Sequence, residues 1–407
     1  MTVGSVAFPD MPAISTIRLN AVSAGIKKTN QLDLMLMELP AGATVAGVFT
    51  QNAFCAAPVM VCKQHITQHP RYILVNSGNA NACTGEQGIT AALDCCKAIE
   101  ASSSVTHLAH QQVLPFSTGV IGEPLPADKI INAIPALLSG LDKSHWPLAA
   151  NSIMTTDTCP KGASSTFNYQ GETIVVNGIS KGAGMINPNM ATMLGFIATN
   201  ATVKQDVLDV LSFNAANQSF NRITIDGDTS TNDSCILVAA GETTCVVDDS
   251  NSDLFRLLEK AVNSVYKTLA QAIVRDGEGA TKFISVQVEE GATANECLQV
   301  AYAIAHSPLV KTACFASDPN WGRIVAAIGY AGIESLNVDN IRVYLDDVLI
   351  VENGGRADSY REAAGQEVMN QNEITLRVCL GRGDAAETIW TTDLSHEYVT
   401  INAEYRT

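Results

Sequence analysis

The sequence predicts a mixed α/β fold, α+β or layered α/β, in which sheets and helices stack on one another. Apolar residues make up 46% of the 407-residue chain and charged residues only 16%, which is typical of a globular protein with a large core. Aromatic residues account for 6%, so the core must be built mainly from Val, Ile, Leu and Ala. Strand-like and helix-like segments follow one another without strict alternation, which argues against a regular succession of βαβ units.

The N-terminal half combines short strands with two helices. Strands are predicted over 32–39, 43–50, 74–78 and 171–180. After the strand ending at residue 78, a polar loop leads into apolar residues at helical spacing, which predict a helix over 88–102. A further helix is predicted over 127–141, with a kink at Pro135, because proline removes one helical hydrogen bond.

The C-terminal half contains the clearest helical periodicity in the chain. Apolar residues recur every three to four positions over 206–220 and over 253–274, and both segments are predicted to be helices. Strands are predicted over 282–290, 340–354 and 372–383. No internal repeat or low-complexity linker interrupts the pattern, so the length allows two or three domains, or one large body with a subdomain.

The net charge of −16 is concentrated in the C-terminal half. Residues 1–191 contain 10 basic and 11 acidic side chains, and residues 192–407 contain 15 and 30. Nucleic acids and anionic membranes bind basic surfaces, so this distribution disfavours both as partners. The simplest interpretation of the excess acidic residues in the C-terminal half is that they lie on a solvated surface.

Cysteine usage and the N-terminus both favour a cytoplasmic protein. The 11 cysteines are scattered and include no C-x-x-C pair, which fits free thiols in a reducing compartment. The first residues lack the basic and apolar regions of a signal peptide, and no apolar run approaches the roughly 18 residues of a membrane span.

Common cofactor and metal motifs are absent. The segment beginning at Lys181 lacks the third glycine of a dinucleotide fingerprint, because Asn187 occupies that place. Residues 277–282 do not contain the G-K-[ST] of a phosphate loop, and residues 226–237 lack the glycine and glutamate of a calcium loop. No histidine pair has metal-ligand spacing, and no G-x-S-x-G is present. We therefore expect neither a metal nor a bound cofactor.

The segment KGAGMINPNMATMLGF (181–196) places a threonine, Thr192, between a glycine-containing turn and an apolar run. One interpretation is a strand residue whose hydroxyl bonds to backbone. The other is an autocatalytic nucleophile. If the bond after Ala191 were cut, the freed α-amine, with an ordinary pKa of about 7.7–8.0, could act as general base for the adjacent hydroxyl.

This segment resembles the signature of the ArgJ family of ornithine acetyltransferases (glutamate N-acetyltransferases). Further blocks are similar to that family in the same order along essentially the whole chain. They are GVFTQNAFCAAPV, NSGNANACTG, FSTGVIGEPLP, IMTTDTCPK, SFNRITIDGDTSTNDS, IVRDGEGATKF, DPNWGRIVAAIGYAG and the terminal INAEYRT.

The resemblance implies a precursor that cleaves itself between Ala191 and Thr192. Residues 1–191 would form an α chain on one side of the layered core, with the oxyanion hole. Residues 192–407 would form a β chain with the nucleophile at its N-terminus and a C-terminal α/β portion. The implied fold is a sandwich of sheets and helices, shared with self-cleaving aminopeptidases, and the implied assembly is an α2β2 heterotetramer.

The implied reaction is a ping-pong transfer of acetyl from N2-acetyl-L-ornithine to L-glutamate through an acetyl-threonine. The resemblance assigns Thr192 as nucleophile and Thr118 with Gly119 as oxyanion hole. It assigns substrate binding to Thr158, Lys181, Thr192, Glu278, Asn402 and Thr407. Asp157 and Asp226 lie in matching blocks and are given structural or supporting roles only.

Three questions remain open at the level of sequence. The chain could instead be a related self-cleaving aminopeptidase or amidohydrolase, although those relatives tend to use serine. It could also be a binding protein that keeps the scaffold without the activity, although the intact set of site residues argues against this. Nothing in the sequence decides whether acetyl-CoA also serves as an acetyl donor.

Overall fold

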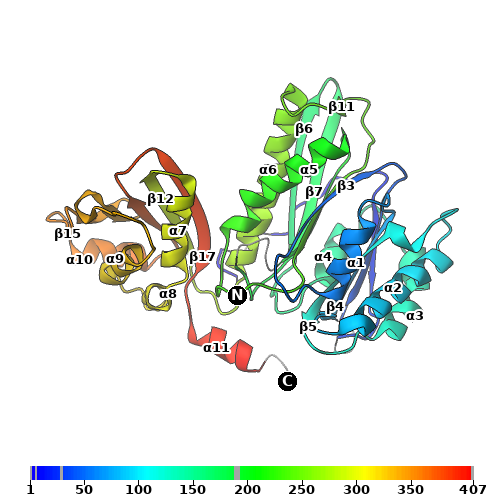
Figure 1. The fold of residues 1–407 in the computed structure, drawn as a ribbon, viewed down its shortest axis with the longest axis horizontal. Helices are drawn as coiled ribbons and strands as arrows, with labels where there is room; N and C mark the ends of the chain where they lie inside the picture. The colour runs from blue at the N-terminus through cyan, green and yellow to red at the C-terminus, as the bar shows by residue number, and fades with distance from the viewer. Residues whose placement is uncertain (1, 5–6, 28–30, 188–192, 405–407) are drawn as a thin grey trace. The chain divides into compact units, whose positions relative to one another are not determined.

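The computed structural model describes residues 2–4, 7–27, 31–187 and 193–404 (Figure 1). These residues divide into two compact units. The larger unit comprises 7–221 and 228–273, and the smaller comprises 2–4, 222–227 and 274–404. The boundary expected between residues 191 and 192 therefore lies within the larger unit.

The larger unit contains two main sheets. The first has the strand order β1-β2-β4-β5 and consists of β1 (Arg18–Val22), β2 (Leu34–Glu38), β4 (Tyr72–Asn79) and β5 (Val113–Val120). The second has the order β3-β10-β8-β7-β6 and consists of β3 (Thr44–Phe49), β10 (Ser234–Ala239), β8 (Leu194–Thr199), β7 (Glu172–Lys181) and β6 (Lys161–Tyr169). A small ribbon pairs β9 (Thr202–Val203) with β11 (Val246–Val247).

The two sheets face each other across a shared apolar core. Phe116 of the first sheet and Phe196 of the second meet edge to face, with ring centroids 5.2 Å apart. The core also contains Trp146 of α4 (Trp146–Ser152), which is fully buried. Facing sheets of this kind bury the alternate side chains of every strand.

Helices cover the outer faces of both sheets. The helices of the larger unit are α1 (Ala57–His65), α2 (Gly85–Ser102), α3 (Ala127–Ser139), α4, α5 (Gln205–Asn217) and α6 (Asp253–Arg275). Helices α2 and α3 pack on the first sheet through Cys96, Ile99 and Ile134. Helix α6 packs on the second, with Val265 and Leu269 against the backbone of Gly178. The resulting helix–sheet–sheet–helix stack confirms the predicted layered α/β class.

The smaller unit is one six-stranded sheet with the order β15-β14-β13-β16-β12-β17. Its strands are β12 (Phe283–Gly291), β13 (Arg342–Leu345), β14 (Val348–Glu352), β15 (Gly355–Arg356), β16 (Glu373–Cys379) and β17 (Ala385–Thr392). Its helices are α7 (Ala294–Ala305), α8 (Pro308–Phe315), α9 (Trp321–Gly329), α10 (Glu362–Met369) and α11 (His396–Ala403). Ile284, Val286 and Val288 point into the helix-covered core, and the residues between them are half-buried, as alternation along a strand requires.

The sequence predictions differ from the structure at several boundaries. The segment 340–354, predicted as one strand, is the hairpin β13–β14, and Asp346 at its turn has φ of +46°. Helix α5 stops at Asn217, and a separate 3₁₀ turn follows at Phe220–Arg222. Helix α3, predicted over 127–141, ends at Ser139 and contains Pro135 as predicted. The other 3₁₀ turns are His110–Gln112 and Val338–Asn340. In the described part of the chain, no helix is both long and apolar enough to cross a bilayer.

Candidate active site

The expected oxyanion residues lie near the end of β5, where it runs parallel to β4. Gly78 of β4 pairs with Gly119 of β5, one position after Ser77 pairs with Thr118. Gly119 has φ of +135°, and a Cβ there would overlap the carbonyl carbon of Gly78 and lie 2.5 Å from the nitrogen of Asn79. Only glycine fits this conformation and this close approach.

Lys181, at the end of β7, contacts the same place. Its Nζ donates to Thr118 Oγ1 over 3.3 Å and to Thr155 Oγ1 over 2.7 Å. A lysine ammonium can only donate, so it occupies a lone pair of the Thr118 hydroxyl and leaves that hydroxyl's own proton for another acceptor. The structure thus brings together two side chains that the sequence analysis assigned to separate tasks.

Asp157 anchors this cluster from inside the fold. Its buried carboxylate accepts from Lys161 Nζ over 2.6 Å, from the Gly182 amide over 2.7 Å and from the Thr155 amide over 3.0 Å. Burial by itself opposes ionisation, but the charges of Lys161 and Lys181 together with these hydrogen bonds hold the pKa of Asp157 well below its usual range. Asp157 is therefore a permanent anion that fixes the position of the lysines around it.

Thr158, the expected substrate-binding threonine, directly follows Asp157 and is exposed. Lys161, four residues after Asp157, was not singled out from the sequence. The only sequence signal for it was the spacing of the two opposite charges.

Lys27 is a second cation that sequence reasoning missed. Its side chain passes over Gly78, since its Cγ is 3.0 Å from the place a Cβ of that glycine would take. Its Nζ donates to the carbonyl oxygens of Leu32 and Ser152 over 3.1 and 3.4 Å. Burial lowers the pKa of Lys27 to about 8, nearby carboxylates oppose this, and Lys181 adds to it. Lys27 and Lys181 therefore bring two amino groups to the surroundings of Thr118, where the carboxylates of Asp33 and Asp157 balance part of their charge.

In the smaller unit, the two expected binding residues Glu278 and Asn402 contact each other. Asn402 Nδ2 donates to Glu278 Oε2 over 2.7 Å and to the carbonyl of Tyr398 over 3.0 Å. Glu278 lies in the turn between α6 and β12, and Asn402 lies on α11. Two residues 124 positions apart in sequence thus place a carboxylate and a side-chain amide next to each other. An ammonium ligand could bind to these oxygen atoms.

Three expected site residues lie outside the described residues: Ala191, Thr192 and Thr407. The described chain resumes at Met193, whose carbonyl accepts from the Ser234 amide over 3.0 Å. Leu194, two positions after Thr192, is paired directly with Lys181 in the register of β8 and β7. The strand that follows the candidate nucleophile therefore starts beside the lysine that contacts Thr118.

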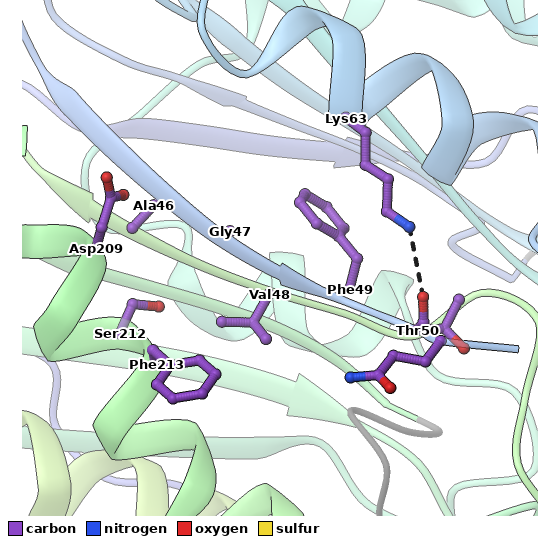
Figure 2. Close-up of a pocket in the computed structure, with 10 residues that line it drawn as sticks. Ala46, Gly47, Val48, Phe49, Thr50, Lys63, Asp209, Ser212 and Phe213 are labelled. Atoms are coloured by element: carbon purple, nitrogen blue, oxygen red, sulfur yellow. Dashed lines mark hydrogen bonds between the residues drawn. The ribbon is translucent and has the colours of Figure 1, made fainter.

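A pocket of about 530 Å³ lies elsewhere on the larger unit (Figure 2). It is lined by Ala46, Gly47, Val48, Phe49, Thr50, Gln51, Lys63, Asp209, Ser212 and Phe213. Two of these residues are joined by the hydrogen bond from Lys63 Nζ to the Thr50 carbonyl, 3.4 Å long (Figure 2). None of the expected site residues lines this pocket, so we do not assign the chemistry to it.

No cluster of three or more His, Cys, Asp or Glu side chains with metal-binding geometry occurs among residues 2–4, 7–27, 31–187 and 193–404. The groups that the structure does gather are hydroxyls, lysines and backbone amides in the larger unit, and a carboxylate with an amide in the smaller. Such groups can bind carboxylates and ammonium ions and can stabilise an oxyanion.

Comparison with known proteins identifies relatives along the full length of the sequence. The profile of the ArgJ family matches residues 18–407. Two proteins named arginine biosynthesis bifunctional protein ArgJ, from Pseudomonas fluorescens (strain Pf0-1) and Pseudomonas syringae pv. tomato, are each 56% identical to this chain over the full length of both. A solved arginine biosynthesis bifunctional protein from Bacillus halodurans is 36% identical with a TM-score of 0.50, and the match covers 53% of this chain and 100% of that one.

Proposed function

Because this chain belongs to the ArgJ family, we propose that it is a glutamate N-acetyltransferase that moves acetyl from N2-acetyl-L-ornithine to L-glutamate. The products are L-ornithine and N-acetyl-L-glutamate, as a role in arginine biosynthesis requires. The single observation that carries the proposal is the contact of Lys181 with Thr118, next to the strand that begins just after Thr192.

In the proposed first half-reaction, Thr192 Oγ attacks the acetamide carbonyl of acetylornithine. The α-amine of Thr192 takes the hydroxyl proton and returns it to the departing ornithine nitrogen as the C–N bond breaks. In the second half-reaction, the amine of glutamate attacks the acetyl ester, the C–O bond breaks, and the threonine hydroxyl regains its proton. The nucleophile and its base are thus carried by one residue.

Both half-reactions pass through a tetrahedral oxyanion, and Thr118 and Gly119 are proposed to stabilise it. The proton of the Thr118 hydroxyl remains available because Lys181 occupies an oxygen lone pair. The Gly119 amide has no side chain beside it, so an oxygen atom could approach closely. Fixed donors of this kind typically contribute a factor of about 10²–10³ to turnover each.

Substrate recognition is proposed to divide by charge. Both substrates carry an α-carboxylate, and Lys181 with Thr158 is proposed to bind it, with Lys27 as a second lysine near Lys181. Ornithine also carries an ammonium at the end of its side chain. Glu278, which already accepts a hydrogen bond from Asn402, is proposed to bind that ammonium. Thr407 stays a predicted contributor.

The test of this proposal starts with the state of the chain. We expect the purified protein to separate into fragments of residues 1–191 and 192–407 under denaturing conditions, with threonine as the second N-terminus. Thr192→Ala should stay uncut and inactive. An active wild-type enzyme that remains a single 407-residue chain would refute the proposal.

Acetyl transfer is then measured with each donor separately. N-acetylornithine with glutamate should give N-acetylglutamate, whereas an amidohydrolase would release acetate and leave glutamate unmodified. The relatives at 56% identity are named bifunctional. We therefore include acetyl-CoA as a second donor, and formation of N-acetylglutamate from it would extend the proposed activity.

A further inference from the structure

The turn that carries Glu278 is fastened to a buried carboxylate from the far end of the chain. Asp393 Oδ1 accepts from the Thr281 amide over 2.8 Å and from the Lys282 amide over 3.0 Å. Asp393 Oδ2 accepts from the Thr281 hydroxyl over 2.5 Å. Asp393 is only 4% exposed, so its carboxylate, the acceptor of all three hydrogen bonds, is largely shielded from water.

A second contact joins the same turn to the start of α11. Ser395 Oγ donates to the carbonyl of Gly279 over 2.6 Å and also accepts from the amide of Tyr398 as the helix N-cap. Gly279 has φ of +67°, and a Cβ there would lie 2.5 Å from the Tyr398 nitrogen. The backbone of the turn at Gly279 therefore lies directly against the backbone of the helix at Tyr398, and only glycine permits so short a distance.

These contacts matter because α11 has little apolar packing of its own. None of its residues, His396–Ala403, is buried, so apolar packing does not fix where the helix lies. Asn402 is seven residues after Ser395, about 10 Å along the helix axis at 1.5 Å per residue. A small change in the angle at Ser395 would thus move Asn402 relative to Glu278.

We propose that Thr281, Asp393 and Ser395 form a clamp that positions Glu278 and Asn402 to receive the ammonium of the ornithine side chain. The inference rests on the proposed function. The three clamp residues are positioning residues, because they hold the Glu278 turn and the Asn402 helix and do not themselves contact the ligand. The ion pair of a carboxylate with an ammonium weakens quickly when its hydrogen-bond geometry is lost, so the clamp should act on binding of the ornithine-containing substrate.

The experiment uses the full chain and a matched set of hydroxyl variants. Thr281→Val removes the hydroxyl bond to Asp393, and Ser395→Ala removes the bond to Gly279 together with the N-cap of α11. Thr281→Ser keeps the hydroxyl, and Thr400→Val removes a hydroxyl of α11 that donates to the His396 carbonyl in the same helix. Thr281 is exposed, so its variants should fold, which thermal unfolding checks.

We expect Thr281→Val and Ser395→Ala to raise KM for N-acetylornithine by about 5–20-fold, with kcat changed by less than about threefold. Thr281→Ser and Thr400→Val should keep KM within about twofold of wild type. A fall in melting temperature with an unchanged KM would show that the clamp only stabilises the fold, and would overturn the inference.

Glu278→Gln separates the inference from the function on which it rests. If Glu278→Gln leaves KM for N-acetylornithine unchanged, the role proposed for Glu278 is wrong and the clamp has nothing to position. If Glu278→Gln raises KM but Thr281→Val does not, the function stands and the clamp is refuted. In the double variant, we expect Thr281→Val to add less than about twofold to the effect of Glu278→Gln, because the two changes act on the same contact. Full additivity would contradict the inference.

Discussion

Asp157 organises the lysines and backbone amides around it from inside the fold. Its carboxylate binds Lys161, the Thr155 amide and the amide of Gly182, which opens the segment leading to the candidate cleavage position. Removing one partner of a buried ion pair leaves the other charge uncompensated. We expect Asp157→Asn to lower the free energy of unfolding at pH 7 by about 3–5 kcal/mol, measured by urea denaturation.

The matched control is Asp157→Asn combined with Lys161→Met, which removes both charges and should recover part of the loss. The pH dependence gives an independent check. The pKa of Asp157 is lower in the folded state than its ordinary value of 3.8, so its contribution to stability is present above about pH 4 and is lost as the pH falls below it. The difference between wild type and Asp157→Asn should therefore shrink in acid. An equal difference at pH 7 and pH 3 would contradict this account.

Sequence blocks allowed roles to be predicted at some positions and gave no signal at others. Thr118, Gly119 and Lys181 were assigned from sequence blocks, and the structure adds that Lys181 contacts Thr118. Lys27 could not be predicted, because its contacts with Gly78 and Ser152 are made by the fold and leave no local pattern.

Among the elements, β3 is informative because it is an edge strand. Unpaired edges expose backbone donors and acceptors to other chains. Here the side-chain amide of Gln205 accepts from the Val45 amide over 3.3 Å and donates to the Val45 carbonyl over 2.9 Å, so it imitates a neighbouring strand. We expect Gln205→Leu to cost about 1–2 kcal/mol of unfolding free energy in urea denaturation.

Gln205→Glu is the informative companion variant. A glutamate keeps an acceptor for the Val45 amide but loses the donor to the Val45 carbonyl. It also lies near Asp209, which accepts a hydrogen bond from Gln205 in the wild type. It should therefore be no more stable than Gln205→Leu at neutral pH and should gain relative stability as the pH falls toward 4. If both variants match wild type, the amide does not support the edge.

The helices show when the spacing of apolar residues is sufficient to predict an element from sequence. Helix α6, 23 residues long, was predicted to within one residue because its apolar stripe repeats over many turns. The shorter helices, of seven to twelve residues, were missed because so few turns do not establish a period; they are α1, α4, α7, α8, α9, α10 and α11. The hairpin at Asp346 was missed because an Asp-Asp turn lacks the glycine that usually marks one.

At the scale of the whole molecule, the second sheet contains strands from both sides of the predicted cleavage position, and these strands are neighbours in the sheet. Strands β3, β7 and β6 come from residues 1–191, whereas β8 and β10 come from residues 192–407. The order β3-β10-β8-β7-β6 places both C-terminal strands between N-terminal ones. Each fragment alone would leave buried strand edges without partners, which costs free energy for every unpaired backbone group.

We therefore expect the two fragments, once cleaved, to stay together as one folded particle. They should co-elute in size-exclusion chromatography under native conditions and separate only in denaturant. Expressed alone, residues 1–191 should aggregate, because β7 would have lost β8 and β3 would have lost β10. Co-expression of 1–191 with 192–407 as separate chains should restore a soluble complex. Recovery of a monomeric, cooperatively unfolding 1–191 fragment would show that this sheet does not bind the two halves together.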